Sequence, residues 1–224
     1  MKKKKSIIFF SYICFMKYDS YRYIYPPRPK NPIPPTDLNF WDNGSLICQP
    51  KLNGSNSVIF KSPSGIKAMN RHNQSLTGFR ISDELKSILP QDGHFVINGE
   101  YMNKGKLDQF GNNFNHKLVI FDILVQNSEY LVGKSVSDRL EILNSIFNPK
   151  ESKWGYLHQI SENIFMVKSF ESNFKSTFDD LTKIDMVEGV VLKRKSARLE
   201  IGIREENNSN WMLKSRKPHK NYKF

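Results

Sequence analysis

A single lysine, Lys51, lies in an otherwise uncharged stretch, CQPKLNGSNSVIF, at residues 48–60. The turn-forming pair Asn53-Gly54 follows it directly, and an apolar run comes next. A deprotonated lysine amine is a nucleophile that can form a covalent intermediate with its substrate. Taken alone, a lysine beside a turn is more often an ordinary surface residue. The choice between these two interpretations therefore depends on the rest of the chain.

The charge of the chain indicates what kind of partner it meets. Lys and Arg number 34 against 22 Asp and Glu, which gives a net charge of +12 and a pI near 9.6. Ten Lys or Arg and three Glu fall between Lys193 and Phe224, so a net +7 lies in this segment. Such a surface attracts polyanions, and nucleic acid is the expected partner. No membrane partner is expected, because the sequence shows no basic amphipathic helix.

Other patterns that could do chemistry are incomplete. Cys14 and Cys48 are too few for a zinc site and indicate a reducing interior rather than a disulfide framework. The stretch YLVGKSVSD contains the Gly-Lys-Ser of a phosphate-binding loop, but Ser128 stands where that loop needs a glycine. The five histidines show no paired ligand spacing, and no G-x-S-x-G elbow marks a serine hydrolase. Lys51 thus remains the main candidate for covalent chemistry.

The elements that would position this lysine read as strands with helices between them. Strands are expected at 45–52 and 56–62, around the Asn53-Gly54 turn, and at 66–71, 94–102, 116–126, 187–195 and 210–217. Helices are expected at 80–89 with Ser82 as cap, at 134–147 with a Ser135 and Asp138 capping pattern, and at 176–184. A succession of hairpins with helices between them predicts an antiparallel α+β fold.

The first 35 residues read differently from the rest. Residues 25–35, YPPRPKNPIPP, hold six prolines, which predicts an extended polyproline-like arm and neither a helix nor a strand. Residues 1–24 are basic and apolar; their start superficially fits a signal peptide but has no small-residue cleavage site and is too short to span a bilayer. We interpret residues 1–24 as an upstream extension that need not be native, with Met16 as a second start. The domain is expected over 36–224.

The K-L-N-G at Lys51 resembles the K-x-D/N-G signature of covalent nucleotidyltransferases, the superfamily of ATP-dependent DNA and RNA ligases and mRNA capping enzymes. Further blocks follow in the order of that family: NRHNQ (70–74), FVINGEYM (95–102), LVIFDILVQNSEYLVGKSVSDRLEIL (118–143), VEGVVLK (187–193) and WMLKSRK (211–217). Jointly and in this order the blocks are specific, and the resemblance covers residues 20–224. It implies the α+β fold of a ligase-type nucleotidyltransferase domain, with antiparallel sheets forming a nucleotide cleft and helices outside.

The resemblance also assigns roles to individual residues. Lys51 is the expected nucleophile: it attacks the α-phosphate of ATP and must be deprotonated, which neighbouring cations and partial burial favour. The other expected nucleotide contacts are Gln49 to the adenine edge, Phe121 to the adenine face, Arg71 to the ribose or a phosphate, Glu100 to the ribose hydroxyls, and Lys193, Lys214 and Arg216 to the α-phosphate, where they help expel pyrophosphate. Glu188 is expected to bind Mg²⁺ or Mn²⁺.

The sequence departs from the family pattern at two places. Asn53 replaces the aspartate that is commonest in the first motif, a change that keeps the turn geometry and polarity. The sequence also ends seven residues after the last block, where many ligases and capping enzymes carry an OB-fold. We therefore expect a catalytic core without that domain. Lys217, Lys220 and Lys223 are expected to hold the polynucleotide backbone in its place, or else an accessory protein supplies those contacts.

The implied function is an ATP-dependent polynucleotide ligase that seals 5′-phosphate to 3′-hydroxyl ends in nicked or broken DNA or RNA. ATP is favoured over GTP because the blocks from Lys51 to Glu100 and the stretch FDILVQNSEYLVGK are ligase-like. Two alternatives stay open: a GTP-using mRNA guanylyltransferase, and a non-catalytic nucleic-acid-binding protein with a ligase-like core. DNA and RNA are not distinguished, because phosphate contacts carry no such information. A cytoplasmic or other intracellular location is expected, and the Lys, Asn and Ile content suggests a phage or a cell with an AT-rich genome.

Overall fold

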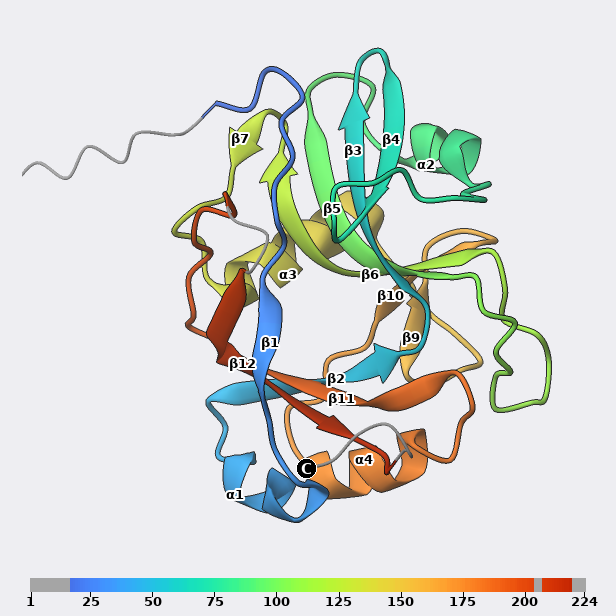
Figure 1. Ribbon diagram of the computed structural model, residues 1–224, viewed down its shortest axis with the longest axis vertical. Coiled ribbons are helices and arrows are strands. Elements are labelled where there is room, and N and C mark those ends of the chain that lie inside the picture. Colours follow the sequence, from blue (N-terminus) through green and yellow to red (C-terminus); the bar gives the residue numbers. More distant parts are fainter. Residues whose placement is uncertain (1–16, 204–206, 219–224) are drawn as a thin grey trace, which may run out of the picture.

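The computed structural model describes residues 17–203 and 207–218, which form two β-sheets with helices on their outer faces (Figure 1). The larger sheet has the strand order β4-β3-β5-β6-β10-β9-β8, with β7 paired to β6, and the smaller sheet has the order β1-β12-β11-β2. The α+β class expected from the sequence is confirmed. No helix in these ranges is both long and apolar enough to cross a membrane.

The strands of the larger sheet are β3 (Ser55–Ser62), β4 (Gly65–Asn70), β5 (Phe95–Met102), β6 (Lys117–Gln126), β7 (Glu129–Tyr130), β8 (Lys150–Glu151), β9 (Leu157–Gln159) and β10 (Ile164–Val167). The smaller sheet contains β1 (Arg28–Pro32), β2 (Leu46–Leu52), β11 (Val187–Arg194) and β12 (Asn208–Arg216). The helices are α1 (Leu38–Trp41), α2 (Ser82–Ile88), α3 (Val136–Phe147) and α4 (Phe174–Leu181), and Pro35–Asp37 forms a 3₁₀ turn.

Each sheet buries one apolar core. The core of the larger sheet is built from β3, β5 and β6, and α3 packs behind β6 (Figure 1). The core of the smaller sheet lies against α4, where Phe174 and Phe178 meet Val190 and Leu192 of β11. Because side chains alternate along a strand, the residues of β11 between these apolar ones face the opposite side. That side looks toward the larger sheet, and it is where polar residues can gather.

Most of the expected elements are confirmed. The strands at 56–62 and 66–71 form a hairpin as β3 and β4, and α3 begins with the expected capping box: Ser135 Oγ accepts from Asp138 N at 3.1 Å, and Asp138 Oδ2 accepts from Ser135 N at 2.8 Å. The expectation of Ser82 as a helix cap is wrong, because Ile81 occupies the cap position of α2 and no side chain bonds there.

The hairpin expected at Asn53-Gly54 is also wrong. β2 pairs with β11 of the smaller sheet, whereas β3 pairs with β4 and β5 of the larger one, so the chain crosses between sheets at this point. Gly54 serves a close approach here: a Cβ atom would lie 2.5 Å from the carbonyl oxygen of Tyr101. The crossover therefore packs closely against the end of β5.

The proline-rich arm is not free of regular structure, contrary to expectation. Residues 28–32 form β1, which pairs in parallel with β12, and the register shifts between Pro29 and Asn31. Proline is tolerated because β1 lies at the edge of the sheet, where a strand can lack ladder donors. Of the preceding extension, the described part also packs: Tyr18 and Ile24 are buried in the core of the larger sheet. Residues 1–16 lie outside the described ranges.

The start of α4 differs from the expected residue 176 for a tertiary reason. The helix begins at Phe174, and Asp42 Oδ2 accepts from the backbone N–H groups of Asn173 at 2.6 Å and Phe174 at 3.3 Å. These donors have no partner within a helix, so a carboxylate 131 residues away in sequence supplies one. A local pattern does not contain that information.

We predict that Gly189→Ala strongly destabilises the fold. Gly189 has a φ of +155°, and a Cβ atom there would lie 1.9 Å from the carbonyl oxygen of Ser215 on β12. Gly133 is the matched control, since its φ is +85° and nothing lies within 4 Å of the point that a Cβ atom would occupy. Gly133→Ala should lower the free energy of unfolding by about 1 kcal/mol, and Gly189→Ala by about 3 kcal/mol or more. Equal losses of unfolding free energy in the two variants, measured by urea unfolding, would contradict this interpretation of the contact.

Candidate functional site

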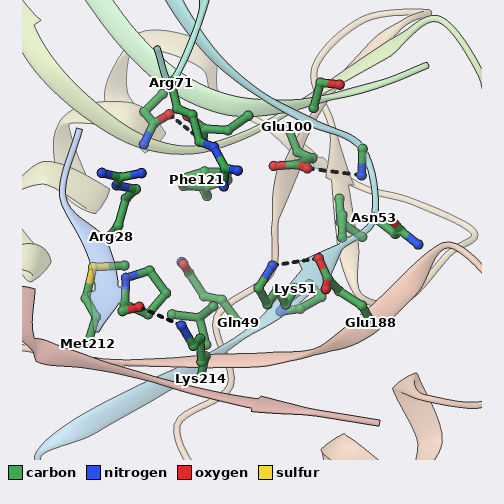
Figure 2. A pocket seen from close by; sticks show the side chains of 18 of the residues that line it. Arg28, Gln49, Lys51, Asn53, Arg71, Glu100, Phe121, Glu188, Met212 and Lys214 are labelled. Carbon is green, nitrogen blue, oxygen red and sulfur yellow. Dashed lines mark hydrogen bonds and ion pairs between the residues drawn. The ribbon is translucent and has the colours of Figure 1, made fainter. Parts of the chain in front are cut away.

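A cavity of about 700 Å³ lies between the two sheets (Figure 2). Both sheets contribute to its walls, and the crossover after β2 closes one end. Nine residues singled out from the sequence line it: Gln49, Lys51, Arg71, Glu100, Phe121, Glu188, Lys193, Lys214 and Arg216. Residues separated by up to 167 positions in the chain therefore meet at one place.

The smaller sheet forms one wall, and its strand register arranges the side chains in rows. The two rows at the centre of the wall are Lys51, Gly189 and Arg216, and Gln49, Val191 and Lys214. The ladder between β2 and β11 shifts between Val187 and Gly189, so Glu188 forms a β-bulge opposite the end of β2. A bulge redirects the side chain of its extra residue, and here the Glu188 carboxylate faces the cavity.

Glu188 joins the cations of the first row. Its Oε1 lies 2.6 Å from Lys51 Nζ, and its Oε2 lies 3.3 Å from Arg216 Nε. The side chains of Lys51 and Glu188 are each 19% exposed, so the ion pair is open to a ligand entering the cavity. The amine is thus held at a defined point of the wall rather than free in solvent.

Glu100, on β5, faces this group from the larger sheet. Its Oε1 accepts from the backbone N–H of Gly54 at 3.0 Å, which ties it to the crossover. Burial raises the pKa of Glu100 from its ordinary 4.5 to about 7, and the negative charge of Glu188 adds to this rise; Lys51, Gly54 and Lys104 oppose it. A carboxyl group near neutral pKa can act as a donor or an acceptor toward hydroxyl groups of a ligand.

Lys193 lies against Phe121. Its Nζ donates to the Phe121 carbonyl oxygen at 2.9 Å and lies 5.1 Å from the centre of the ring. The residue is only 3% exposed, and burial lowers its pKa to about 8 although Asp122 opposes the change. This geometry holds the aromatic ring of Phe121 in the cavity wall.

Behind Phe121, an ion pair joins β6 to α3. Arg139 Nε and Nη2 lie 2.8 and 3.1 Å from the two oxygens of Asp122, and both side chains are almost fully buried. The guanidinium also donates to the Lys134 carbonyl oxygen at 2.8 Å. The Arg139 charge holds the pKa of Asp122 below its ordinary value against the effect of burial. Both residues lie in the block at 118–143, but no sequence pattern assigned a role to either of them.

Gln49 and Lys214 form the second row. Gln49 is 2% exposed, and its Nε2 donates to Ser169 Oγ at 2.9 Å. Its Oε1 is buried without a hydrogen-bond partner in the described structure and is an acceptor for a donor group of a ligand. Lys214 Nζ donates to the Pro29 carbonyl oxygen at 3.2 Å; burial lowers its pKa, and Arg216 and Lys51 add to that effect.

The remaining expected residues lie at the rim or away from the cavity. Arg71 is exposed, and its Nε donates to His72 Nε2 at 3.0 Å. Lys217 does not line the cavity: its ammonium donates to the carbonyl oxygens of Thr182 and Ile184 at 3.4 and 3.2 Å. Lys220 and Lys223 lie outside the described residues.

Two cations of the lining were missed in the sequence. Arg28 enters the cavity from β1, within the proline-rich segment, where no motif marks it (Figure 2). Lys104 follows β5, and its Nζ donates to Asn53 Oδ1 at 3.2 Å. Within residues 17–203 and 207–218, no group of three or more His, Cys, Asp or Glu side chains is arranged to hold a metal ion.

We predict a pH dependence of stability that comes from Glu100. Because its pKa is raised to about 7, the protonated form stabilises the fold fully below pH 4.5, and this contribution is lost as the pH rises through 7. Glu100→Gln should remove that loss, which amounts to about 3 kcal/mol at most. Urea unfolding at pH 5 and pH 8 measures the difference, with Glu162→Gln at an exposed position as control. Parallel pH profiles for wild type and Glu100→Gln would rule the explanation out.

Comparison with known proteins bears on this geometry. A family model described as ATP dependent DNA ligase domain matches residues 33–214. Mycobacterial DNA ligase D complexed with ATP and MES has a similar fold, with 16% sequence identity and a TM-score of 0.61. The similarity covers 86% of this chain and 60% of that one. The chain thus spans 60% of the length of that structure.

Two further solved structures show the same fold. Chlorella virus DNA ligase-adenylate is 17% identical with a TM-score of 0.51, covering 84% of this chain and 67% of that one. A structure from a structure-function analysis of Lig E DNA ligases is 16% identical with a TM-score of 0.53, covering 87% and 70%. A search of curated protein sequences finds no significant match.

Proposed function

The chain belongs to the family of ATP-dependent DNA ligase domains, and from this premise we propose that it forms a lysyl-AMP intermediate on Lys51 and serves to seal 5′-phosphate to 3′-hydroxyl ends. The observation that carries the proposal is the cavity itself. Lys51 lies in it with a carboxylate at 2.6 Å, and Arg216, Lys214, Glu100 and an aromatic ring surround it. That combination suits a purine nucleotide whose α-phosphate meets an amine.

The proposed binding mode follows from the walls. The purine stacks on Phe121, whose ring is held by Lys193, and Gln49 Oε1 accepts from the exocyclic amine of adenine. In the orientation held by Ser169, the same oxygen would face the carbonyl oxygen of guanine. Gln49 therefore favours ATP over GTP, and hence a ligase over an mRNA guanylyltransferase. Glu100 receives the ribose hydroxyls on the opposite wall.

The first chemical step would take place at the first row of the smaller sheet. The lone pair of Lys51 Nζ forms the bond to the α-phosphorus, the bond from the α-phosphorus to the bridging oxygen breaks, and its electron pair leaves with pyrophosphate. The ammonium must first transfer a proton, for which the Glu188 carboxylate at 2.6 Å is an acceptor, and the amine then exchanges this contact for one with the substrate. Arg216 and Lys214, which line the same cavity, would stabilise charge on the phosphoryl oxygens.

Two further steps would complete sealing. An oxygen of the 5′-phosphate attacks the α-phosphorus, and the bond to Nζ breaks as the amine regains its proton. The 3′-hydroxyl oxygen then attacks the 5′-phosphorus, releasing AMP and a proton. The family favours DNA as the polynucleotide, with RNA as the second candidate. The proposal includes an accessory domain or protein that contacts the polynucleotide, and the outlying lysines at 217, 220 and 223 are proposed to assist it.

Glu188 is the residue that we propose to hold Mg²⁺ or Mn²⁺. Mg²⁺ typically keeps several waters and binds through one or two carboxylates and substrate phosphates. One cavity carboxylate beside the α-phosphate position fits that pattern, and its oxygens are within reach because the side chain is partly exposed. When bound, the ion would neutralise charge on the phosphates.

We predict that Lys51→Ala abolishes covalent attachment of AMP. Lys51→Arg should fail as well, since a guanidinium stays protonated and is a poor nucleophile. The measurement is incubation with labelled ATP or GTP followed by a denaturing gel, with Lys30→Ala on exposed β1 as control. Label from ATP supports the proposal, label from GTP alone indicates a guanylyltransferase, and no label with folded wild type indicates a non-catalytic binding protein. AMP retained by Lys51→Ala would refute the assignment of the nucleophile.

A further inference from the structure

The cavity holds more positive charge than its own carboxylates balance. Two carboxylates, Glu100 and Glu188, face seven cations: Arg28, Lys51, Arg71, Lys104, Lys193, Lys214 and Arg216. The sequence motifs assign roles to five of these cations and leave out Arg28 and Lys104. Arg28 belongs to β1 of the smaller sheet, whereas Lys104 comes from the loop that follows β5.

Lys104 lines the cavity next to the crossover that follows Lys51. Its Nζ donates to Asn53 Oδ1 at 3.2 Å, and Asn53 is two residues beyond Lys51 on the crossover. The positive charge of Lys104 also acts on Glu100, which is tied to the same crossover through Gly54. These interactions connect Lys104, which lines the cavity, to the crossover that follows Lys51.

The contact with Asn53 leaves the charge of Lys104 intact. An amide oxygen accepts a hydrogen bond without carrying a charge, and within the described ranges no carboxylate lies within 4 Å of the Lys104 amine. Lys106, two residues later, shows the contrast: it forms an ion pair with Asp185 at 3.0 Å and does not line the cavity. One lysine of this loop is thus neutralised and the other is available to an anion.

We propose that Lys104 is a further catalytic residue, one that binds the leaving pyrophosphate while Lys51 becomes adenylylated. This inference rests on the proposed function. Cations of the smaller sheet, Arg216 and Lys214, share a wall with Lys51 and serve the α-phosphate that stays on the protein. Lys104 stands outside that group, and an anion that leaves needs a cation that is not committed to the phosphate left behind.

The physical advantage is that charge is stabilised where it develops. As the bond from the α-phosphorus to the bridging oxygen breaks, negative charge grows on pyrophosphate, and a positioned cation lowers the barrier by stabilising it. Lys104 exchanges a hydrogen bond with a neutral amide for one with phosphate, in which both donor and acceptor are charged, and this bond is the stronger of the two. Its exposed position lets the amine follow the anion out of the cavity.

The test compares Lys104→Ala with Lys106→Ala, a matched lysine of the same loop. Three rates are measured. The first is adenylylation with labelled ATP, and the second is its reversal, in which pyrophosphate removes AMP from the adenylylated protein. The third is the transfer of AMP from that protein to nicked DNA in the absence of ATP. We expect Lys104→Ala to slow the first two about tenfold or more and to leave transfer unchanged. Lys106→Ala should leave all three at the wild-type rates. Thermal unfolding of both variants checks that the fold is retained.

A second variant tests the role of the neutral amide. Asn53→Asp keeps the size of the side chain but places a carboxylate against Lys104, so pyrophosphate should strip AMP more slowly from this variant too. Equal rates of adenylylation for Lys104→Ala and Lys106→Ala would overturn the inference. It would also be overturned if Lys104→Ala slowed adenylylation and AMP transfer equally, because Lys104 would then contact the phosphate of AMP rather than pyrophosphate. If wild type retains no AMP, the proposed function fails; if it retains AMP and Lys104→Ala behaves like wild type, only this inference fails.

Discussion

The pairing of β11 with β2 on one side and with β12 on the other is the constraint on which the site depends. Gly189 lies opposite both Lys51 and Arg216, and its lack of a side chain lets β12 approach to a distance that a methyl group would forbid. The bulge beside it turns Glu188 between the two cations. Three segments far apart in the sequence thereby place an amine, a carboxylate and a guanidinium in one row.

The cavity wall formed by the larger sheet is stabilised by buried charged groups. Asp122 and Arg139 form a two-bonded ion pair between β6 and α3, and Lys193 adds a buried ammonium beside it. Removing one member of such a pair leaves an unpaired buried charge, which typically costs about 3–5 kcal/mol. The same groups support the Phe121 backbone from behind. The packing of α3 is therefore coupled to the surface on which a purine would stack.

Between these walls the cavity is strongly positive, and this charge connects the fold to the proposed chemistry. Seven cations against two carboxylates make an empty cavity electrostatically unfavourable, and a polyanionic nucleotide reduces that repulsion on binding. Burial and the charge of Glu188 raise the pKa of Glu100 despite the surrounding cations, so ionising this carboxyl group in the folded site costs free energy. The nucleotide, once bound, brings charges and hydroxyl groups that complement both features.

The sequence by itself determined the family, the α+β class and nine of the residues that line the cavity, because short ordered blocks around Lys51, Glu188 and Lys214 carry the residue types that phosphoryl chemistry needs. Amphipathic periodicity and the capping box likewise located α3, since both are local. The tertiary structure alone decided that β2 leaves for the other sheet at Gly54, that the proline segment becomes an edge strand, and that Arg28 and Lys104 enter the cavity. Those outcomes depend on which strand edges are free and which backbones come close, and such contacts between distant segments leave no local pattern.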